Sequence, residues 1–255
     1  MTTTPYIDTV KELQKINAKN PDEKTTEWIK SLQGDSNNDK IKLSGPISVA
    51  ASKLLPTQNE IDFGKSLAYP LSIVSPENVF ASNETTPVVY SNPNMELVVT
   101  EIGGKYYIID GHHRWSGVYL VNPKASLNCY VLSGFKDATQ ALKATQLSIA
   151  KACLLKKKSI PSADTDPNAI NLLNTSVTEE NFKAKVKSTI EEGSIKDKVI
   201  ETFTKYAKNS DGNSVTDIDG IANYIWNNVL IMRKNNPPSG PQSDRIYMPQ
   251  TAGDF

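Results

Sequence analysis

The chain has 255 residues, of which 38% are apolar, and its 28 basic and 28 acidic side chains balance to a formal net charge of zero. This composition fits one ordinary domain with helical additions, or two small domains. It argues against a protein that depends on non-specific DNA binding, because such binding comes largely from a positive excess that neutralises phosphates.

Two short helices and a loop are predicted at the N-terminus. Apolar residues recur at helical spacing over 5–18, where Pro5 suits a helix start, and again over 22–33. Gly, Ser, Asn and Asp fill much of 34–45, which is typical of a loop. Residues 1–45 are therefore predicted to be an N-terminal helical region.

An α/β core is predicted over residues 46–135. Runs rich in β-formers indicate strands, and Gly103-Gly104 between two of them is a hairpin signal. Prolines interrupt the middle of this stretch too often for long regular elements. In chain order, the predicted elements are a strand-like segment at 47–51 that ends with 54–56, a helix at 59–69 capped by Asn59, a looser stretch at 70–95, strands at 95–100 and 105–109, a helix at 112–121 and a strand at 126–132.

A helical region is predicted over 136–234, followed by an extended tail over 235–255 that is rich in Pro, Gly and Ser. Thr178 and Ser214 are cap signals for two of its helices, and a polar linker at 159–177 precedes the second helix. The predicted helices cover 136–156, 178–192, 194–208 and 214–233. The predicted fold class is therefore α+β.

The most informative feature is the segment Asp110-Gly111-His112-His113-Arg114, which follows a β-rich run and opens a helical pattern. A glycine at this turn lets the backbone bend and expose its N–H groups at a helix start, where the dipole favours an anion. Arg114 can offer a forked donor to phosphate oxygens. The only two histidines of the chain lie here and can donate hydrogen bonds or move protons near neutral pH. The pattern predicts a phosphate-binding loop that Asp110 orients.

Taken one at a time, these residues have simpler interpretations. One histidine could bond to a backbone carbonyl in the core, Asp110 could cap the helix, and Arg114 could form a surface ion pair. Two adjacent histidines rarely ligate the same ion, and the sequence offers no obvious third ligand. No metal site is therefore predicted.

The motif resembles that of a known superfamily. The strand–Asp-Gly-His-His-Arg–helix unit is similar to the ParB/sulfiredoxin-like fold, in its ParB-like branch. Leu54-Leu55-Pro56-Thr57-Gln58, placed before a short helix, is similar to a Pro-Thr-Gln turn of that branch. The resemblance covers residues 46–135. It implies a small mixed-sheet core that binds nucleotide phosphates, and some members of the branch are labelled nucleases.

Three relatives differ at the loop. Sulfiredoxin has a reactive Cys where this chain has His112, so the resemblance does not extend to its chemistry. ParB proteins bind CTP with Gly-Glu-Arg-Arg, of which only Gly111 and Arg114 match here. A free-serine kinase uses Asp-Gly-His-His-Arg to hold nucleotide phosphates and an upstream acid as base. That resemblance implies Glu60 as the base, with Asp62 second, although Glu60 could equally be an exposed acid in the first turn of a helix.

The cysteines and the N-terminus bear on the compartment. Cys129 and Cys153 form neither a CxxC pair nor a disulfide framework. The N-terminus lacks the regions of a signal peptide, and no apolar run approaches the ~20 residues of a membrane helix. We therefore expect a protein of the cytoplasm, or of a virus or phage particle, without a membrane partner.

The first functional hypothesis is a ParB-like nucleotide- or phosphate-binding protein that takes a nucleoside triphosphate with Mg²⁺. If it catalyses, phosphoryl transfer or phosphodiester hydrolysis is the expected class, as in a ParB-like nuclease, an NTPase or a small-molecule kinase. The expected phosphate-binding residues are Asp110, Gly111, His112, His113 and Arg114, and the expected catalytic residues are Glu60, His112 and His113.

Two other functional classes are also consistent with the sequence. The core could be a scaffold in a non-catalytic structural or interaction protein, such as a particle component, that docks through its C-terminal helices and tail. It could also belong to a partition-like DNA-binding protein. The basic cluster of Lys151 and Lys156-Lys157-Lys158 would then contact nucleic acid, although favourable interaction with the dipole at a helix C-terminus is the preferred explanation of this cluster.

Overall fold

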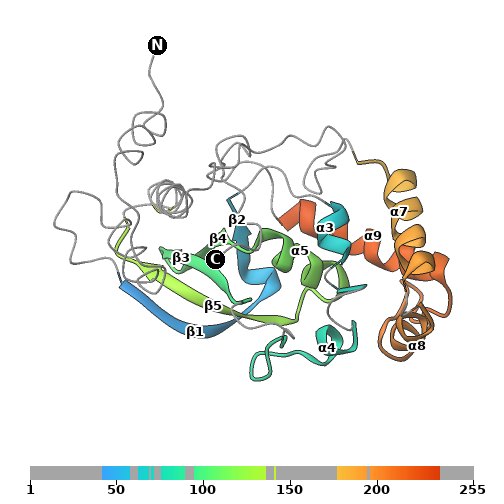
Figure 1. The fold of residues 1–255 in the computed structure, drawn as a ribbon, viewed down its shortest axis with the longest axis horizontal. Helices are drawn as coiled ribbons and strands as arrows, with labels where there is room; N and C mark the ends of the chain where they lie inside the picture. Colours follow the sequence, from blue (N-terminus) through green and yellow to red (C-terminus); the bar gives the residue numbers. More distant parts are fainter. Residues whose placement is uncertain are drawn as a thin grey trace, which may run out of the picture.

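The fold combines a five-stranded mixed sheet with helices in the part of the chain that the structure describes (Figure 1). This confirms the predicted α+β class. The structure is a computed structural model, and it describes residues 42–57, 63–68, 70–71, 76–89, 95–135, 141, 177–193 and 196–235. The helices predicted over 5–33, nearly all of the helix predicted over 136–156 and the tail after residue 235 lie outside these residues.

The sheet has the strand order β1-β5-β3-β4-β2. β1 pairs with β5, and β3 with β4, in the antiparallel sense, whereas β3 runs parallel to β5 and β2 parallel to β4. Gly103 and Gly104 join β3 to β4 with φ angles of 60° and 75°, which is the predicted hairpin. The strands are β1 Lys42–Ala50, β2 Leu54–Pro56, β3 Leu97–Ile102, β4 Lys105–Asp110 and β5 Ser126–Ser133.

The first strand differs from its prediction in two ways. β1 begins at Lys42, within the stretch predicted as a loop over 34–45, because Lys42 to Ser44 pair with β5. A register shift between Ser44 and Ile47 accommodates the intervening Gly-Pro pair. The segment predicted as one unit is instead two strands at opposite edges of the sheet, separated by the short η2 helix Ala51–Lys53.

The helices agree with the predicted ones except near their ends. A short helix, α4, also forms within the proline-rich stretch, with Pro76 in its first position. The last helix begins at Ile218 and not after Ser214, because Ser214 pairs with Lys208 while the Asp217 carboxylate accepts a bond from the Gly220 amide at 2.6 Å. The helices are α3 Phe63–Ala68, α4 Pro76–Ala81, α5 His112–Val121, α7 Glu179–Glu192, α8 Lys196–Tyr206 and α9 Ile218–Asn235.

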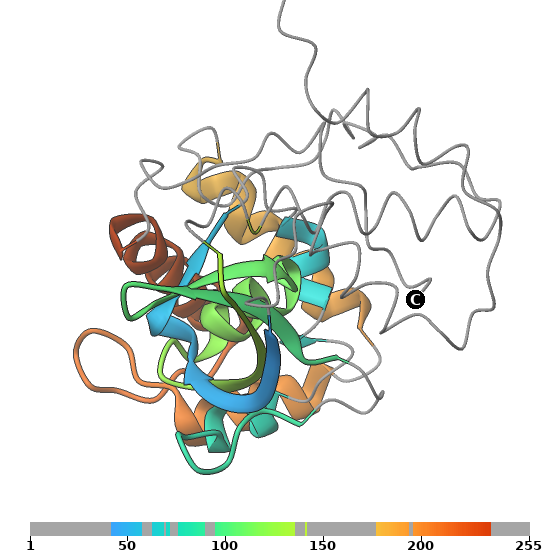
Figure 2. The ribbon, with the colours of Figure 1, turned by 90° about the vertical axis from the view of Figure 1, so that its left-hand side faces the viewer.

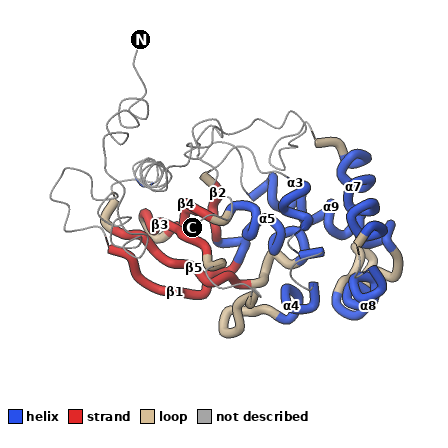
Figure 3. The backbone as a smooth tube through the Cα atoms, in the orientation of Figure 1, coloured by secondary structure: helices blue, strands red, loops and turns tan. Residues whose placement is uncertain are grey.

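Helix α5 lies between the sheet and α9 (Figures 1 and 2). Trp115 and every later residue of α5 are buried, so this helix contacts protein on all sides. The Trp115 indole donates a hydrogen bond to the Ala51 carbonyl at 2.8 Å and ties α5 to the start of η2, directly after β1. Helix α9 lies on the side of α5 that faces away from the strands, and α7 and α8 lie farther from the sheet, as Figure 3 shows.

One hydrophobic cluster joins the sheet to the C-terminal helices. It includes Leu97 and Trp115 as well as Phe182, Phe203 and Ile225, each with 0% exposure. Side chains from the regions predicted as 46–135 and 136–234 therefore bury one another. None of the helices in the described ranges combines the length and the apolar character that crossing a membrane requires.

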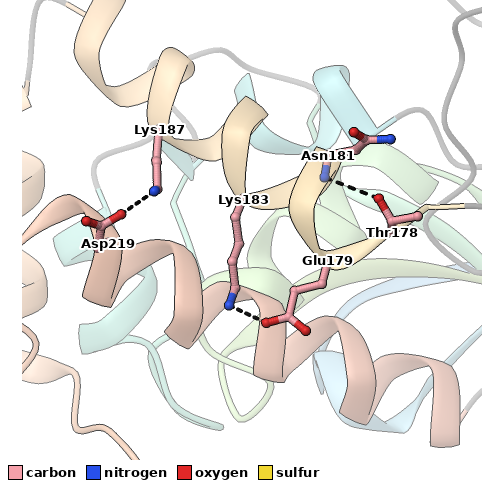
Figure 4. Close-up of polar contacts among 6 residues, drawn as sticks. All are labelled: Thr178, Glu179, Asn181, Lys183, Lys187 and Asp219. Carbon is pink, nitrogen blue, oxygen red and sulfur yellow. Dashed lines mark hydrogen bonds and ion pairs between the residues drawn. The ribbon is translucent and has the colours of Figure 1, made fainter.

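Polar contacts cap the start of α7 and link this helix to α9 (Figure 4). Thr178 is the N-cap of α7, and its hydroxyl accepts a hydrogen bond from the Asn181 amide at 3.3 Å. Lys183 pairs with Glu179 within the helix, and Lys187 pairs with Asp219 of α9. The cap satisfies one of the amides that a helix start leaves without a partner.

We expect Thr178→Ala to lower the free energy of unfolding by about 1 kcal/mol, because it removes this cap. Urea denaturation of the full chain measures the change. Lys187→Gln is the comparison variant, since it removes an ion pair whose side chains are 41% and 74% exposed, and such pairs contribute less than about 1 kcal/mol. An unaltered stability in Thr178→Ala would show that the cap contributes nothing.

Candidate functional site

The turn from β4 into α5 is built around Gly111. This residue is the N-cap of α5 and has φ 102° and ψ 21°, in the left-handed region that glycine adopts without strain. A Cβ atom at this position would lie 2.7 Å from Cγ of Leu97 and 3.0 Å from Nη2 of Arg114. Any larger residue would therefore displace its neighbours, so the turn requires glycine.

The neighbouring strands bring two further segments to this turn. β2 runs parallel to β4, with Pro56 opposite Ile108, so Thr57 leaves the sheet beside Asp110 and the start of α5. β3 runs antiparallel to β4, and its start places Glu96 and Leu97 on the other side. The loop thus lies at the carboxyl ends of two adjacent parallel strands, which is where open α/β sheets commonly bind ligands.

His112 points into the protein. It is 4% exposed, and its Nε2 atom accepts a hydrogen bond from the Thr57 amide at 3.1 Å. The Thr57 hydroxyl donates to the Ile108 carbonyl at 2.5 Å, which fixes Thr57 against β4. An Nε2 atom that accepts a bond carries no proton, so the ring is neutral with its hydrogen on Nδ1.

Burial keeps this ring neutral. The pKa of His112 is lowered from 6.5 to about 3, mainly by desolvation; charge interactions with His113 and Arg114 act in the same direction, and Asp110 partly opposes them. A charged imidazole would also lose the bond from the Thr57 amide. His112 is therefore a hydrogen-bond acceptor between β2 and α5 at neutral pH.

Arg114 lies over the turn in a fixed orientation. Its Nη2 atom donates to Oδ2 of Asp110 at 3.0 Å and to the Glu96 carbonyl at 3.3 Å, and the two side chains of the ion pair are 15% and 28% exposed. The buried Nε atom of Arg114 has no hydrogen-bond partner among the described residues. The guanidinium is therefore held at one nitrogen while its Nε donor is unused within the described part of the chain.

The first turn of α5 has no side-chain cap, because its N-cap is a glycine. His113, in this turn, is half-buried, and its carbonyl accepts a hydrogen bond from the Ser116 hydroxyl at 3.2 Å. The Ser116 hydroxyl also forms a hydrogen bond of 2.7 Å with the Ser66 hydroxyl, which joins α5 to α3. Helix-start amides, a fixed guanidinium and an imidazole together provide donors suited to a phosphate.

The structure brings most of the predicted site residues into one turn but gives them different surroundings. Gly111 forms the bend, Asp110 holds Arg114, and His113 and Arg114 lie on the first turn of α5. His112 faces Thr57 within the core. The predicted base, Glu60, and the second choice, Asp62, lie outside the described residues.

Two residues at the site were not predicted from the sequence. Thr57 belongs to the Pro-Thr-Gln turn that supported the family resemblance, so the sequence contained a signal for it. Glu96 contributes only its backbone carbonyl, which any residue could supply, and no sequence pattern marks it.

The described residues form no candidate metal site, and among them helices α7 and α8 do not form a basic surface. No three His, Cys, Asp or Glu side chains in the described ranges gather in a way that could hold a metal ion. Helices α7 and α8 contain six lysines and six carboxylates, so they carry no positive excess of the kind that non-specific DNA binding uses. The basic cluster at 151–158 lies outside the described residues.

Comparison of the chain with protein-family models, with curated proteins and with solved structures finds no match.

We expect the neutral His112 to make folding sensitive to acid. Its pKa is lower in the folded protein than in the unfolded chain, so its contribution is complete above about pH 6.5 and is lost as the pH falls towards 3. Relative to His112→Gln, wild type should lose roughly 2 kcal/mol of unfolding free energy between pH 7 and pH 5. Urea denaturation at several pH values measures this difference.

His113→Gln is the matched control for this experiment. It removes the other histidine of the same turn and leaves the Thr57–His112 bond in place, so its pH dependence should retain the His112 contribution. If wild type and His112→Gln lose stability in parallel from pH 7 to pH 5, His112 is not a buried neutral ring.

Proposed function

We propose that the chain binds a phosphate-bearing ligand, of the nucleotide class, at the first turn of α5. The main support for this proposal is the position of the Arg114 guanidinium. Asp110 and the Glu96 carbonyl hold it beside a helix start that has no side-chain cap. Charge-assisted hydrogen bonds from a guanidinium to phosphate are among the stronger polar contacts in proteins.

The electrostatics of the turn favour a bound anion. The N-terminus of α5 contributes about half a positive charge, concentrated in its first turn. Asp110 offsets the charge of Arg114, but it also fixes the guanidinium before a ligand arrives. A ligand therefore need not order this side chain, which lowers the entropic cost of binding.

Each residue of the motif has a distinct role in the proposal. The bend at Gly111 directs the amides of the first turn towards the ligand, and Arg114 and His113 donate hydrogen bonds to phosphate oxygens. His112 does not contact the ligand, because Thr57 occupies its Nε2 atom. Its role is instead to hold the end of β2 beside the loop. The sequence had predicted a direct contact between His112 and phosphate.

The family resemblance supports the same proposal. The strand–loop–helix unit forms at the motif that resembles the ParB-like branch, and the Pro-Thr-Gln turn lies directly beside it through the β2–β4 pairing. In that branch the corresponding loop holds nucleotide phosphates. We therefore propose a ParB-like nucleotide-binding core, within the cytoplasm or a particle assembled there.

A nucleoside triphosphate with Mg²⁺ is the ligand that the resemblance implies. Mg²⁺ in such sites is held mainly by phosphate oxygens and water, with one or two carboxylates. Asp110, which lies beside the first turn, is the described carboxylate closest in sequence to the proposed phosphate position. If the bound phosphate reacts, we propose phosphoryl transfer or phosphodiester hydrolysis, with His113 as the described group able to move a proton and Glu60 as the base.

We expect wild type to bind MgATP or inorganic phosphate, and Arg114→Met to weaken that binding by about 10- to 100-fold, the equivalent of one or two charge-assisted hydrogen bonds. Isothermal titration calorimetry measures both affinities. Lys105→Met is the control, because it removes the same charge from an exposed position at the opposite end of β4. Equal affinities in Arg114→Met and wild type would refute the proposed site.

A further inference from the structure

The C-terminal end of α5 is bonded by side chains of α9. The Leu120 carbonyl accepts a hydrogen bond from Nδ2 of Asn228 at 2.8 Å, and the Val121 carbonyl accepts one from the Tyr224 hydroxyl at 3.0 Å. These partners lie 108 and 103 positions further along the chain. Asn228 is 6% exposed, so its amide is a buried polar group with a defined partner.

These bonds satisfy groups that a helix cannot satisfy by itself. The last carbonyls of any α-helix lack intrahelical donors, and α5 is buried at this end, where water cannot replace them. The Asn122 amide donates a hydrogen bond to the Val118 carbonyl at 2.9 Å. Side chains of α9 supply the donors for the Leu120 and Val121 carbonyls. A third contact, between Nδ2 of Asn235 and the Tyr119 hydroxyl at 3.2 Å, extends the same interface.

Helix α5 is thus fixed at both ends by segments distant in sequence. At its start, His112 accepts the bond from Thr57, and at its end α9 bonds two carbonyls. A helix of ten residues is about 15 Å long and behaves as a rigid rod. A rotation or shift at its C-terminal end therefore moves the first turn, which carries His113 and Arg114, together with the Gly111 bend that precedes it.

We propose that Asn228 and Tyr224 are positioning residues for the turn at Gly111–Arg114, so that the C-terminal helices are part of the ligand-binding unit and not a separate module. The effect on ligand affinity rests on the proposed function above, whereas the effect on the geometry of α5 does not. Neither residue contacts the ligand, since both act through the carbonyls of α5.

The test uses the full chain with Asn228→Asp, which places a carboxylate against the Leu120 carbonyl at the negative end of α5. Asn227→Asp is the matched control, because it introduces the same charge at the adjacent, exposed position of α9. Two readouts are measured by NMR: hydrogen exchange of the α5 amides from 115 to 121, and the amide chemical shifts of Gly111 and His113. Calorimetry with MgATP and inorganic phosphate as probes gives the affinity.

We expect Asn228→Asp to raise exchange at 115–121 at least tenfold over the control, to shift the Gly111 and His113 amides, and to weaken probe binding at least fivefold. Increased exchange with unchanged Gly111 and His113 shifts would overturn the proposal, because α9 would then stabilise α5 without positioning its start. Unchanged exchange would overturn it as well.

If Asn228→Asp does not fold, Tyr224→Phe replaces it, since it removes one hydroxyl and keeps the ring; the same pattern at smaller size supports the proposal, and wild-type exchange and shifts contradict it. If wild type binds neither probe while the shifts of Gly111 and His113 respond to Asn228→Asp, the proposed ligand fails and the positioning role stands.

Discussion

The site depends on the lack of space beside Gly111. A Cβ atom there would overlap Leu97, and the backbone of Gly111 lies in the left-handed region. The connection from β4 to α5 therefore requires glycine at this position. This bend begins α5 immediately after the strand. It turns His112 towards Thr57 and places Arg114 over the turn, where Asp110 and the Glu96 carbonyl hold it. Every role that we assign in the loop follows from this one backbone conformation.

The two histidines of the motif are not equivalent, although they are adjacent in sequence. Successive residues of a helix point about 100° apart, so at a buried helix start one ring faces the core while the next is half-buried. His112 accepts a bond that joins two elements, and burial lowers its pKa to about 3. Ligand chemistry in the loop therefore rests on His113 and Arg114, with His112 as part of the frame that supports them.

Local signals predicted the elements around the site, and long-range contacts account for what they missed. The Gly103-Gly104 hairpin, the strand before Asp110 and the helix after Gly111 follow from turn chemistry and residue pattern. No local pattern places β1 and β2 at opposite edges of the sheet, or assigns the last carbonyls of α5 to Asn228 and Tyr224, because those partners are settled only when distant segments pack together. The burial of His112 did have a signal, since the stretch from Trp115 to Val121 contains no charged residue, as expected for a helix enclosed by protein.

Phosphate binding at the first turn of α5 can be observed in a titration of the isotopically labelled full-length chain with inorganic phosphate and then MgATP. In two-dimensional amide spectra, we expect saturable shifts of the Gly111, His112, His113 and Arg114 amides, with the amide of Lys105 at the other end of β4 unaffected. Amides of that turn that keep their positions at saturating ligand, while shifts occur elsewhere or nowhere, would contradict it.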